Sequence, residues 1–245
     1  MMNLKARQAF SKQAWHYDNY VDIHAEIAQR LMHSVPPKQY RQIVELGCGT
    51  GLLSQLIAKA YPLSTLTLVD FSKDMLQVCQ HKLSTNENVN YQHQAIETFM
   101  LPPNTDLVLS SMCLHWVEDL AGYLARLKNM MGKGCRFHFA ILTQNSLQQW
   151  RDLCLAFTGR SPTLYFPEIN IFQKIFRSGQ FEFQTKNVMY QSCQHFLKTL
   201  KNFGGATSCS AHQTFSIREM KTLLAAFNLT KPYMSYDIIY GDIIL

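Results

Sequence analysis

Three glycines at every second position form a turn directly after the first strand-like run of the chain. Gly47, Gly49 and Gly51 follow a β-branched apolar stretch, and an amphipathic helical pattern begins at Leu52. Glycine is needed where the backbone takes a positive φ or touches a ligand, because a Cβ would clash there. A strand, turn and helix of this kind lie at the carboxyl edge of a parallel sheet. The spacing predicts a cradle for a nucleotide-like cofactor, with Cys48 inside it.

Two carboxylates flank this turn. Glu45 precedes it, and Asp70 ends the next strand-like run, where an acid can accept hydrogen bonds from both hydroxyls of a ribose. The dinucleotide fingerprint requires a glycine at position 52, where this chain has leucine, and Glu45 would repel a pyrophosphate. The pair suits a nucleoside that carries positive charge, such as S-adenosylmethionine. An incidental glycine-rich turn is the alternative, but strand, turn, helix and acid all agree.

Other side chains end or follow strands at the same predicted edge of the sheet. Ligands bind outside the carboxyl ends of such strands. We therefore assign these residues to the cofactor site: Phe71, Ile96, Ser110 and Ser111.

The alternation of strands and helices predicts an α/β fold, a Rossmann-like doubly wound sheet. The helical pattern at 21–33 precedes the first strand, and a helical insertion follows the fifth. Asn145 or Ser146 can cap the first inserted helix, and Ser72 and Ser216 can cap two others. Seven strands are expected, the last of them inside the sheet, near 43–46, 65–70, 89–95, 106–111, 135–142, 181–190 and 233–245.

The chain has 245 residues, of which 47% are hydrophobic and 16% charged. This length predicts one domain. We divide it into an N-terminal helical flap (1–35), a cofactor-binding core (40–142), a lid or substrate region (143–215) and a closing helix with the last strand (216–245).

Composition also excludes several classes of protein. No signal peptide and no apolar run of about 20 residues is present, so we expect a cytoplasmic protein that does not cross a membrane. The seven cysteines and nine histidines show no metal-binding spacing, which predicts no metal. The net charge of +6 favours an acidic partner. Because the basic residues are dispersed, we do not expect a nucleic acid.

The chain resembles the class I methyltransferases, and among them the biotin-pathway family that methylates malonyl-acyl carrier protein. The resemblance covers the whole chain and includes segments outside the cofactor core. These segments are Ala9–Ser11 with His16–Tyr17, Leu142–Leu147, Phe166–Pro167 and Leu197–Thr207. The segment Leu197–Thr207 is the most specific of them.

Two departures from the family pattern concern different sites. Gly204-Gly205 contains an additional glycine, and Ala95 stands where relatives usually have the acid that meets the adenine amine. Gln94 or the backbone near Ile96 would have to replace that acid.

The resemblance implies that S-adenosylmethionine methylates the free carboxylate of a malonyl group, leaving S-adenosylhomocysteine. A carboxylate is already ionised at neutral pH, so no general base is expected. Tyr17 would lie over the methyl group and the acceptor, and His115 would belong to the substrate site. Lys198 or Lys201 would meet the negative charges of the substrate or of an acidic acyl carrier protein. Aromatic packing for Tyr17, a hydrogen-bonded edge position for His115 and a solvated helix face for the lysines are the structural alternatives.

The sequence is also compatible with other functions. The chain could methylate another small carboxylate or a quinone, bind S-adenosylmethionine without catalysis, or modify RNA. We expect a monomer or a weak dimer.

Overall fold

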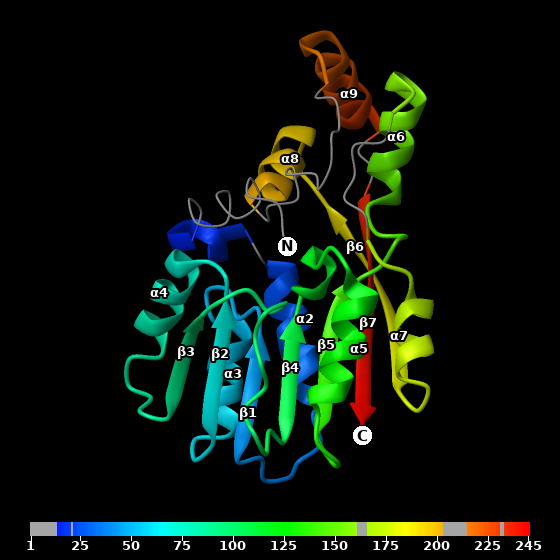
Figure 1. Ribbon diagram of the computed structural model, residues 1–245. Coiled ribbons are helices and arrows are strands. Elements are labelled where there is room, and N and C mark those ends of the chain that lie inside the picture. The colour runs from blue at the N-terminus through cyan, green and yellow to red at the C-terminus, as the bar shows by residue number, and fades with distance from the viewer. Residues whose placement is uncertain (1–13, 21, 161–165, 203–214, 231–232) are drawn as a thin grey trace.

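The computed structural model describes residues 14–20, 22–160, 166–202, 215–230 and 233–245. Its seven strands form one sheet in the order β3-β2-β1-β4-β5-β7-β6, in which β7 runs antiparallel to both of its neighbours (Figure 1). The α/β fold, the strand count and the position of the last strand inside the sheet are thereby confirmed. The strands are β1 (Gln42–Leu46), β2 (Thr65–Asp70), β3 (Val89–His93), β4 (Leu107–Ser111), β5 (Arg136–Leu142), β6 (Gln180–Met189) and β7 (Tyr233–Ile244).

The helices within the described residues follow the predicted order. The flap contains a 3-10 helix, η1 (Ala14–Tyr20), and α2 (Asp22–Ser34). A short 3-10 turn, η2 (Leu114–Trp116), follows β4. The remaining helices are α3 (Leu52–Ala60), α4 (Lys73–Lys82), α5 (Leu120–Met130), α6 (Gln148–Thr158), α7 (Ile169–Ile175), α8 (Cys193–Asn202) and α9 (Ile217–Thr230).

Side-chain alternation along β1 creates two hydrophobic cores. Ile43 faces the core that contains α2 and α3, whereas Val44 faces the core that contains α5 and α7. Because successive strand residues point to opposite faces, one short run anchors helices on both sides. The sheet is thus covered on both faces, and its open functional surface is the carboxyl edge.

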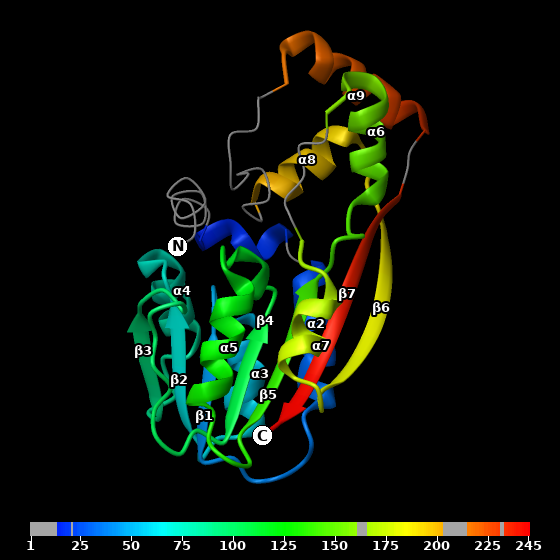
Figure 2. The same cartoon turned by 45° about the vertical axis from the view of Figure 1, so that its right-hand side comes forward.

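The insertion after β5 rises above that edge as a separate layer. Figures 1 and 2 both show α6 beside α9, with α8 extending from β6 back toward the flap. Three aromatic rings join these helices: Trp150 lies 5.3 Å from Phe196, and Phe196 stacks on Phe227 at 5.7 Å between centroids. These contacts belong to the same hydrophobic core as α2 and α3, so they join the lid helices α6 and α8, together with the closing helix α9, to one face of the sheet.

One predicted helix cap is wrong, and two are confirmed. The α6 cap is Leu147 in a left-handed conformation, with no side-chain hydrogen bond, because the Ser146 hydroxyl instead bonds to the backbone of Asp237. Ser72 accepts from Met75 N, and Ser216 forms the expected reciprocal pair with Glu219. The contact to β7 fixes where the lid leaves the sheet.

No helix in the described part of the chain is long and apolar enough to cross a bilayer.

A charged cluster joins β5 to β7 near the amino end of β5. Arg136 donates two hydrogen bonds to Asp242, at 2.7 and 2.6 Å, and His138 Nε2 lies 3.0 Å from Asp242 Oδ1. Burial alone would raise the pKa of Asp242, but the hydrogen bonds from His138 and Arg136 outweigh it and hold that pKa below its usual value. The ionised carboxylate therefore stabilises the folded state.

Asp242→Asn should lower the free energy of unfolding by about 1–3 kcal/mol at pH 7, since a hydrogen bond to a charged group contributes about 1.5–3 kcal/mol. A depressed pKa stabilises the fold above the unfolded value of about 3.9, so the deficit should shrink as the pH falls below it. Urea unfolding measures both effects. Glu182→Gln, which breaks the exposed pair with Arg30, is the control and should cost under about 1 kcal/mol. An equal effect of the two substitutions would contradict the assignment.

Candidate active site

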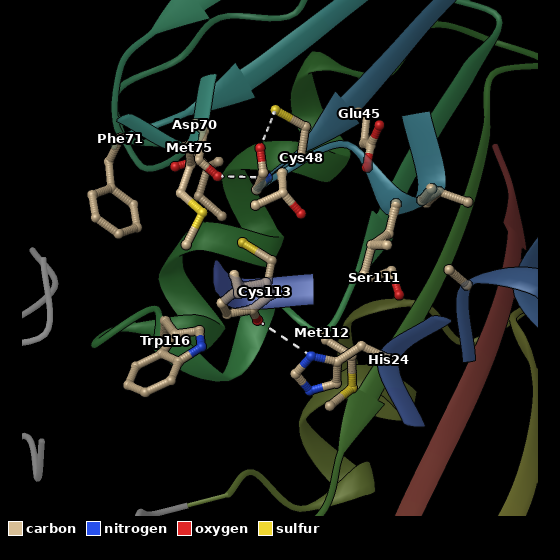
Figure 3. Close-up of a pocket in the computed structure, with 18 of the residues that line it drawn as sticks. His24, Glu45, Cys48, Asp70, Phe71, Met75, Ser111, Met112, Cys113 and Trp116 are labelled. Carbon is tan, nitrogen blue, oxygen red and sulfur yellow. Dashed lines mark hydrogen bonds between the residues drawn. The ribbon is translucent and has the colours of Figure 1, made fainter. Parts of the chain in front are cut away.

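A cleft of about 1010 Å³, measured with the open solvent at its mouth, lies at the carboxyl ends of β1, β2 and β4. The strand order reverses between β1 and β4, the position where open α/β sheets bind ligands. Figure 3 shows its labelled side chains, with Phe71 and Met75 toward one end and His24 toward the other. Most of the residues predicted for the cofactor line it: Glu45, Gly47, Cys48, Gly49, Asp70, Phe71, Ile96 and Ser111.

The glycine turn has the backbone that its spacing predicts. Gly47, Gly49 and Gly51 all have positive φ, at 74°, 54° and 86°. A Cβ on Gly47 would lie 2.1 Å from the Sγ of Cys113, so that position also needs glycine for space. A Cβ on Gly49 would meet no protein atom within 4 Å, in a residue that lines the cleft. The turn therefore leaves room there for a ligand to approach the backbone.

Asp70 connects the turn to β2. Its Oδ2 accepts from Gly49 N at 2.9 Å and its Oδ1 from Ser72 N at 2.8 Å. Burial raises the pKa of Asp70 to about 6, against the opposing effect of these two hydrogen bonds. The carboxylate is ionised at neutral pH and can accept from ligand hydroxyls beside the two backbone groups.

Glu45 is a second acid deep in the cleft, only 2% exposed. The Ser54 hydroxyl donates to its Oε2 at 2.6 Å, but burial dominates and raises the pKa of Glu45 well above the usual value. A buried carboxylate is costly without a cation. An ammonium or sulfonium bound beside Glu45 would relieve that cost, which is the charge that the sequence predicts for the ligand.

Two residues predicted for the cofactor site, Ser110 and Gly51, do not line the cleft. Ser110 does not line the cleft, because it is fully buried and its hydroxyl donates to Leu46 O at 3.0 Å, joining β4 to β1. Gly51 is likewise absent from the lining and packs against Cys79 at the start of α3. Both residues support the carboxyl edge of the sheet without lining the cleft.

Ala95 lines the cleft, and so does Glu97, two residues further on. The Oε1 atom of Glu97 is buried and has no hydrogen-bond partner among the described residues. A carboxylate is thus present close to the position where the acid at 95 is missing.

The flap is held over the cleft by Asp18, a contact that sequence analysis missed. The Thr50 hydroxyl donates to Asp18 Oδ1 at 2.6 Å, and Lys82 forms an ion pair with the same carboxylate. These contacts link η1 to the glycine turn and to α4. Asp18 precedes the helix α2 without any motif, so only the folded chain identifies it.

A second hollow of about 400 Å³ adjoins the first. Tyr17, His24, Met112 and Trp116 line both hollows and so form their junction. Met112 has a φ of 55°, a strained value for a side chain of its size, which is typical of functional sites. The other lining residues are mainly apolar: His115, Leu142, Leu147, Phe166, Leu200 and Tyr236.

Two histidines supply polar atoms to this second hollow. His24 Nδ1 lies 3.2 Å from the Tyr17 hydroxyl, and burial lowers the pKa of His24 to about 4. Burial, with a smaller effect of His24, lowers the pKa of His115 to about 3. Both imidazoles are neutral at pH 7. His115 was predicted here, whereas nothing in the helical pattern around His24 distinguishes it from a core residue.

The predicted lysines lie outside both hollows. Lys198 and Lys201 are exposed on α8, while Leu200 of the same helix lines the second hollow. Helical spacing explains this difference, because residues one and two positions apart face different directions. The segments 9–11 and 203–207, which contribute to the family resemblance, lie outside the described residues.

Comparisons with known proteins agree with this geometry. A family described as a methyltransferase domain matches residues 43–134. A malonyl-[acyl-carrier protein] O-methyltransferase of Ilyobacter polytropus is 26% identical, over 89% of this chain and 84% of that protein. A protein of the same name from Magnetococcus marinus is 28% identical, over 88% and 82%.

Solved structures share the fold at low identity. The YcgJ protein of Bacillus subtilis aligns with a TM-score of 0.63 at 13% identity, covering 89% of this chain and 98% of that one. The N-methyltransferase NodS of Bradyrhizobium japonicum, in complex with S-adenosylhomocysteine, aligns with a TM-score of 0.60 at 12% identity, covering 98% of both chains.

Gly49→Ala should abolish or strongly weaken S-adenosylmethionine binding measured by calorimetry, because the Cβ would enter the space next to the turn. Gly134→Ala is the matched control: Gly134 also has positive φ and open space around its Cβ position, but lies in the turn before β5. Both variants carry a backbone strain of roughly 1–2 kcal/mol. Equal affinities for the donor in the two variants would exclude the cradle.

Affinity for S-adenosylmethionine should fall as the pH is lowered through 6. A raised pKa means that Asp70 takes up a proton near pH 6 in the free protein and loses acceptor capacity. Binding at pH 5.5 should be roughly fourfold weaker than at pH 7.5 if only the ionised form binds. Asp70→Asn should bind weakly throughout and lack the inflection near pH 6. An inflection that persists in this variant would assign it to another group.

Proposed function

We propose that this chain is a class I methyltransferase that uses S-adenosylmethionine and methylates the free carboxylate of a malonyl group held as a thioester on acyl carrier protein. The products are the malonyl methyl ester and S-adenosylhomocysteine. The observation that carries the proposal is the likeness to malonyl-[acyl-carrier protein] O-methyltransferases over nearly nine tenths of this chain. The small, largely apolar hollow beside the cofactor cleft supports it.

We assign the donor site to the first cleft. Gly47, Cys48 and Gly49, with Gly51 behind them, hold the backbone against the donor, and Glu45 faces its positive end. When bound, S-adenosylmethionine supplies an electrophilic methyl group on a sulfonium. Asp70 accepts hydrogen bonds from the ribose hydroxyls.

The adenine site lies toward the end of the cleft that contains Phe71. Phe71 and Ile96 provide apolar contacts for the ring, and Ser111 lines the cleft at the end of β4. We propose that Glu97, with its unpartnered Oε1, accepts from the adenine amine in place of the acid missing at Ala95.

The acceptor site is the second hollow, and Tyr17 lies at its junction with the first. A carboxylate oxygen attacks the methyl group, and the sulfur–methyl bond breaks with its electron pair to sulfur. No proton is transferred, so the protein must align the two groups and exclude water rather than supply a base. Burial keeps the pKa of Tyr17 above its usual value, so its hydroxyl remains a neutral positioning group.

The methyl ester has a physical consequence for later steps. Methylation removes one negative charge from the acyl chain and leaves an apolar end. Apolar pockets of enzymes that elongate fatty acyl chains reject an unpaired carboxylate, because its burial is costly. The uncharged methyl ester would be accepted by such pockets as a primer for chain elongation, which is the role expected in biotin synthesis.

The carrier is proposed to dock on the lid. Lys198 and Lys201 are exposed on α8, whose Leu200 reaches the acceptor hollow. An acidic carrier that approaches α8 would therefore meet positive charge while its thioester arm enters the hollow. The net charge of +6 on this chain would attract an acidic carrier electrostatically.

Methyl transfer should occur to malonyl-acyl carrier protein and more slowly to malonyl-CoA, measured as S-adenosylhomocysteine formed. The double variant Lys198→Ala/Lys201→Ala should raise KM for the carrier substrate by about 3- to 10-fold, as expected for two exposed ion pairs. Its KM for malonyl-CoA should change little. Lys133→Ala, an exposed lysine before β5, is the control.

If neither malonyl-acyl carrier protein nor malonyl-CoA yields product, the proposed function is rejected. Product formation with an unchanged KM for the carrier in the double variant would reject only the docking site. Assays with free dicarboxylic acids and with a quinone separate the remaining small-molecule acceptors.

A further inference from the structure

The described walls of the second hollow offer no cation to pair with a carboxylate. Among its described lining residues there is no lysine or arginine. The Tyr236 hydroxyl is already bonded to the hydroxyl of Tyr190, at 2.7 Å. A carboxylate placed in this hollow without donors would lose its hydration uncompensated. The remaining polar groups must therefore provide its hydrogen bonds.

His24 is one of these groups. It lies on α2, is 9% exposed, and its ring stacks on that of Tyr17 with centroids 6.1 Å apart. When the Tyr17 hydroxyl donates to His24 Nδ1, the neutral imidazole carries its proton on Nε2 and can donate from there. Figure 3 shows the His24 ring beside Met112, on the side of the cleft away from Phe71.

His115 is a second such group, and it comes from η2, the 3-10 turn after β4. Its Nδ1 atom is buried and makes no hydrogen bond to any described residue. The ring is fixed between Trp116 and Phe166, at centroid distances of 5.3 and 5.7 Å. An unsatisfied buried nitrogen costs stability, and a ligand in the hollow would satisfy it.

We propose that His24 and His115 together form the binding site for the acceptor's carboxylate, and that they hold it by hydrogen bonds from neutral imidazoles. The inference rests on the proposed function and adds the residues that select an acyl group with a free acid. The two rings reach the same hollow from α2 and from the loop after β4, with Tyr17 orienting His24.

Neutral donors suit this reaction better than a cation. A lysine or arginine would draw electron density from the attacking oxygen and stabilise the substrate more than the transition state. In the transition state the carboxylate loses its negative charge, so an ion pair formed beforehand would raise the barrier. Burial of both imidazoles keeps them uncharged, as their lowered pKa values indicate.

Equilibrium binding tests the site independently of turnover. The probes are malonyl-pantetheine, which has a carboxylate, and acetyl-pantetheine, which lacks one, each titrated into the protein saturated with S-adenosylhomocysteine. The wild-type protein should prefer the malonyl compound. His24→Leu and His115→Leu should each lower malonyl affinity by roughly 10- to 100-fold, since a hydrogen bond to a charged group is lost, and leave acetyl affinity unchanged.

Two sets of variants separate hydrogen bonding from packing. His24→Gln and His115→Gln keep a neutral donor and should recover most of the malonyl preference. His33→Gln replaces an exposed histidine at the far end of α2 and should behave as wild type. Calorimetry with S-adenosylhomocysteine alone should show that all variants retain a folded donor site.

The outcomes are distinguishable. An unchanged malonyl preference in both leucine variants overturns the inference, and so does an equal loss of malonyl and acetyl affinity, which indicates a packing role. Failure of both glutamine variants to recover the preference overturns the neutral-donor assignment. Malonyl binding that depends on the histidines in a protein without methyl transfer would support the site and reject the proposed function instead.

Discussion

The carboxylate of Asp70 is the point on which the site depends, because it joins the ends of two neighbouring strands. It accepts one backbone N–H from the glycine turn after β1 and another from the start of α4, after β2. The turn can reach it only because Gly47 and Gly49 adopt positive φ. Asp70 also lines the cleft, so the residue that shapes the turn is the one that we propose for the ribose hydroxyls.

Charge distribution separates the two hollows chemically. The first contains the buried acids Glu45 and Asp70 and has no lysine or arginine among its described lining residues, which favours a cationic donor. The second contains neutral histidines and apolar walls, which accept an anion without neutralising it. Tyr17 and Met112 lie where the two meet. On the proposed function, a positive donor in the first hollow and a negative acceptor in the second would meet at this junction.

The flap and the lid complete this enclosure from opposite sides. Asp18 connects η1 to Thr50 of the turn and to Lys82 of α4, which places Tyr17 over the cleft. Phe166 and Leu200 bring the insertion after β5 to the acceptor hollow. The aromatic contacts of Trp150 and Phe196 with Phe227 of α9 join this insertion to the core that also contains α2 and α3, and so hold it above the sheet edge.

Sequence by itself determined the order of strands and helices, the glycine turn and the two acids, because these depend on local periodicity and on backbone conformations that only glycine adopts readily. It also placed His115 at the sheet edge, since that residue follows a strand directly. Only the tertiary structure decided that the Ser110 hydroxyl donates to Leu46 O, that Ser146 bonds to β7 instead of capping α6, and that His24 shares a hollow with His115. Each of these depends on which partner another segment brings within hydrogen-bonding distance. That distance is set by packing between residues far apart in the chain, and no local pattern contains it.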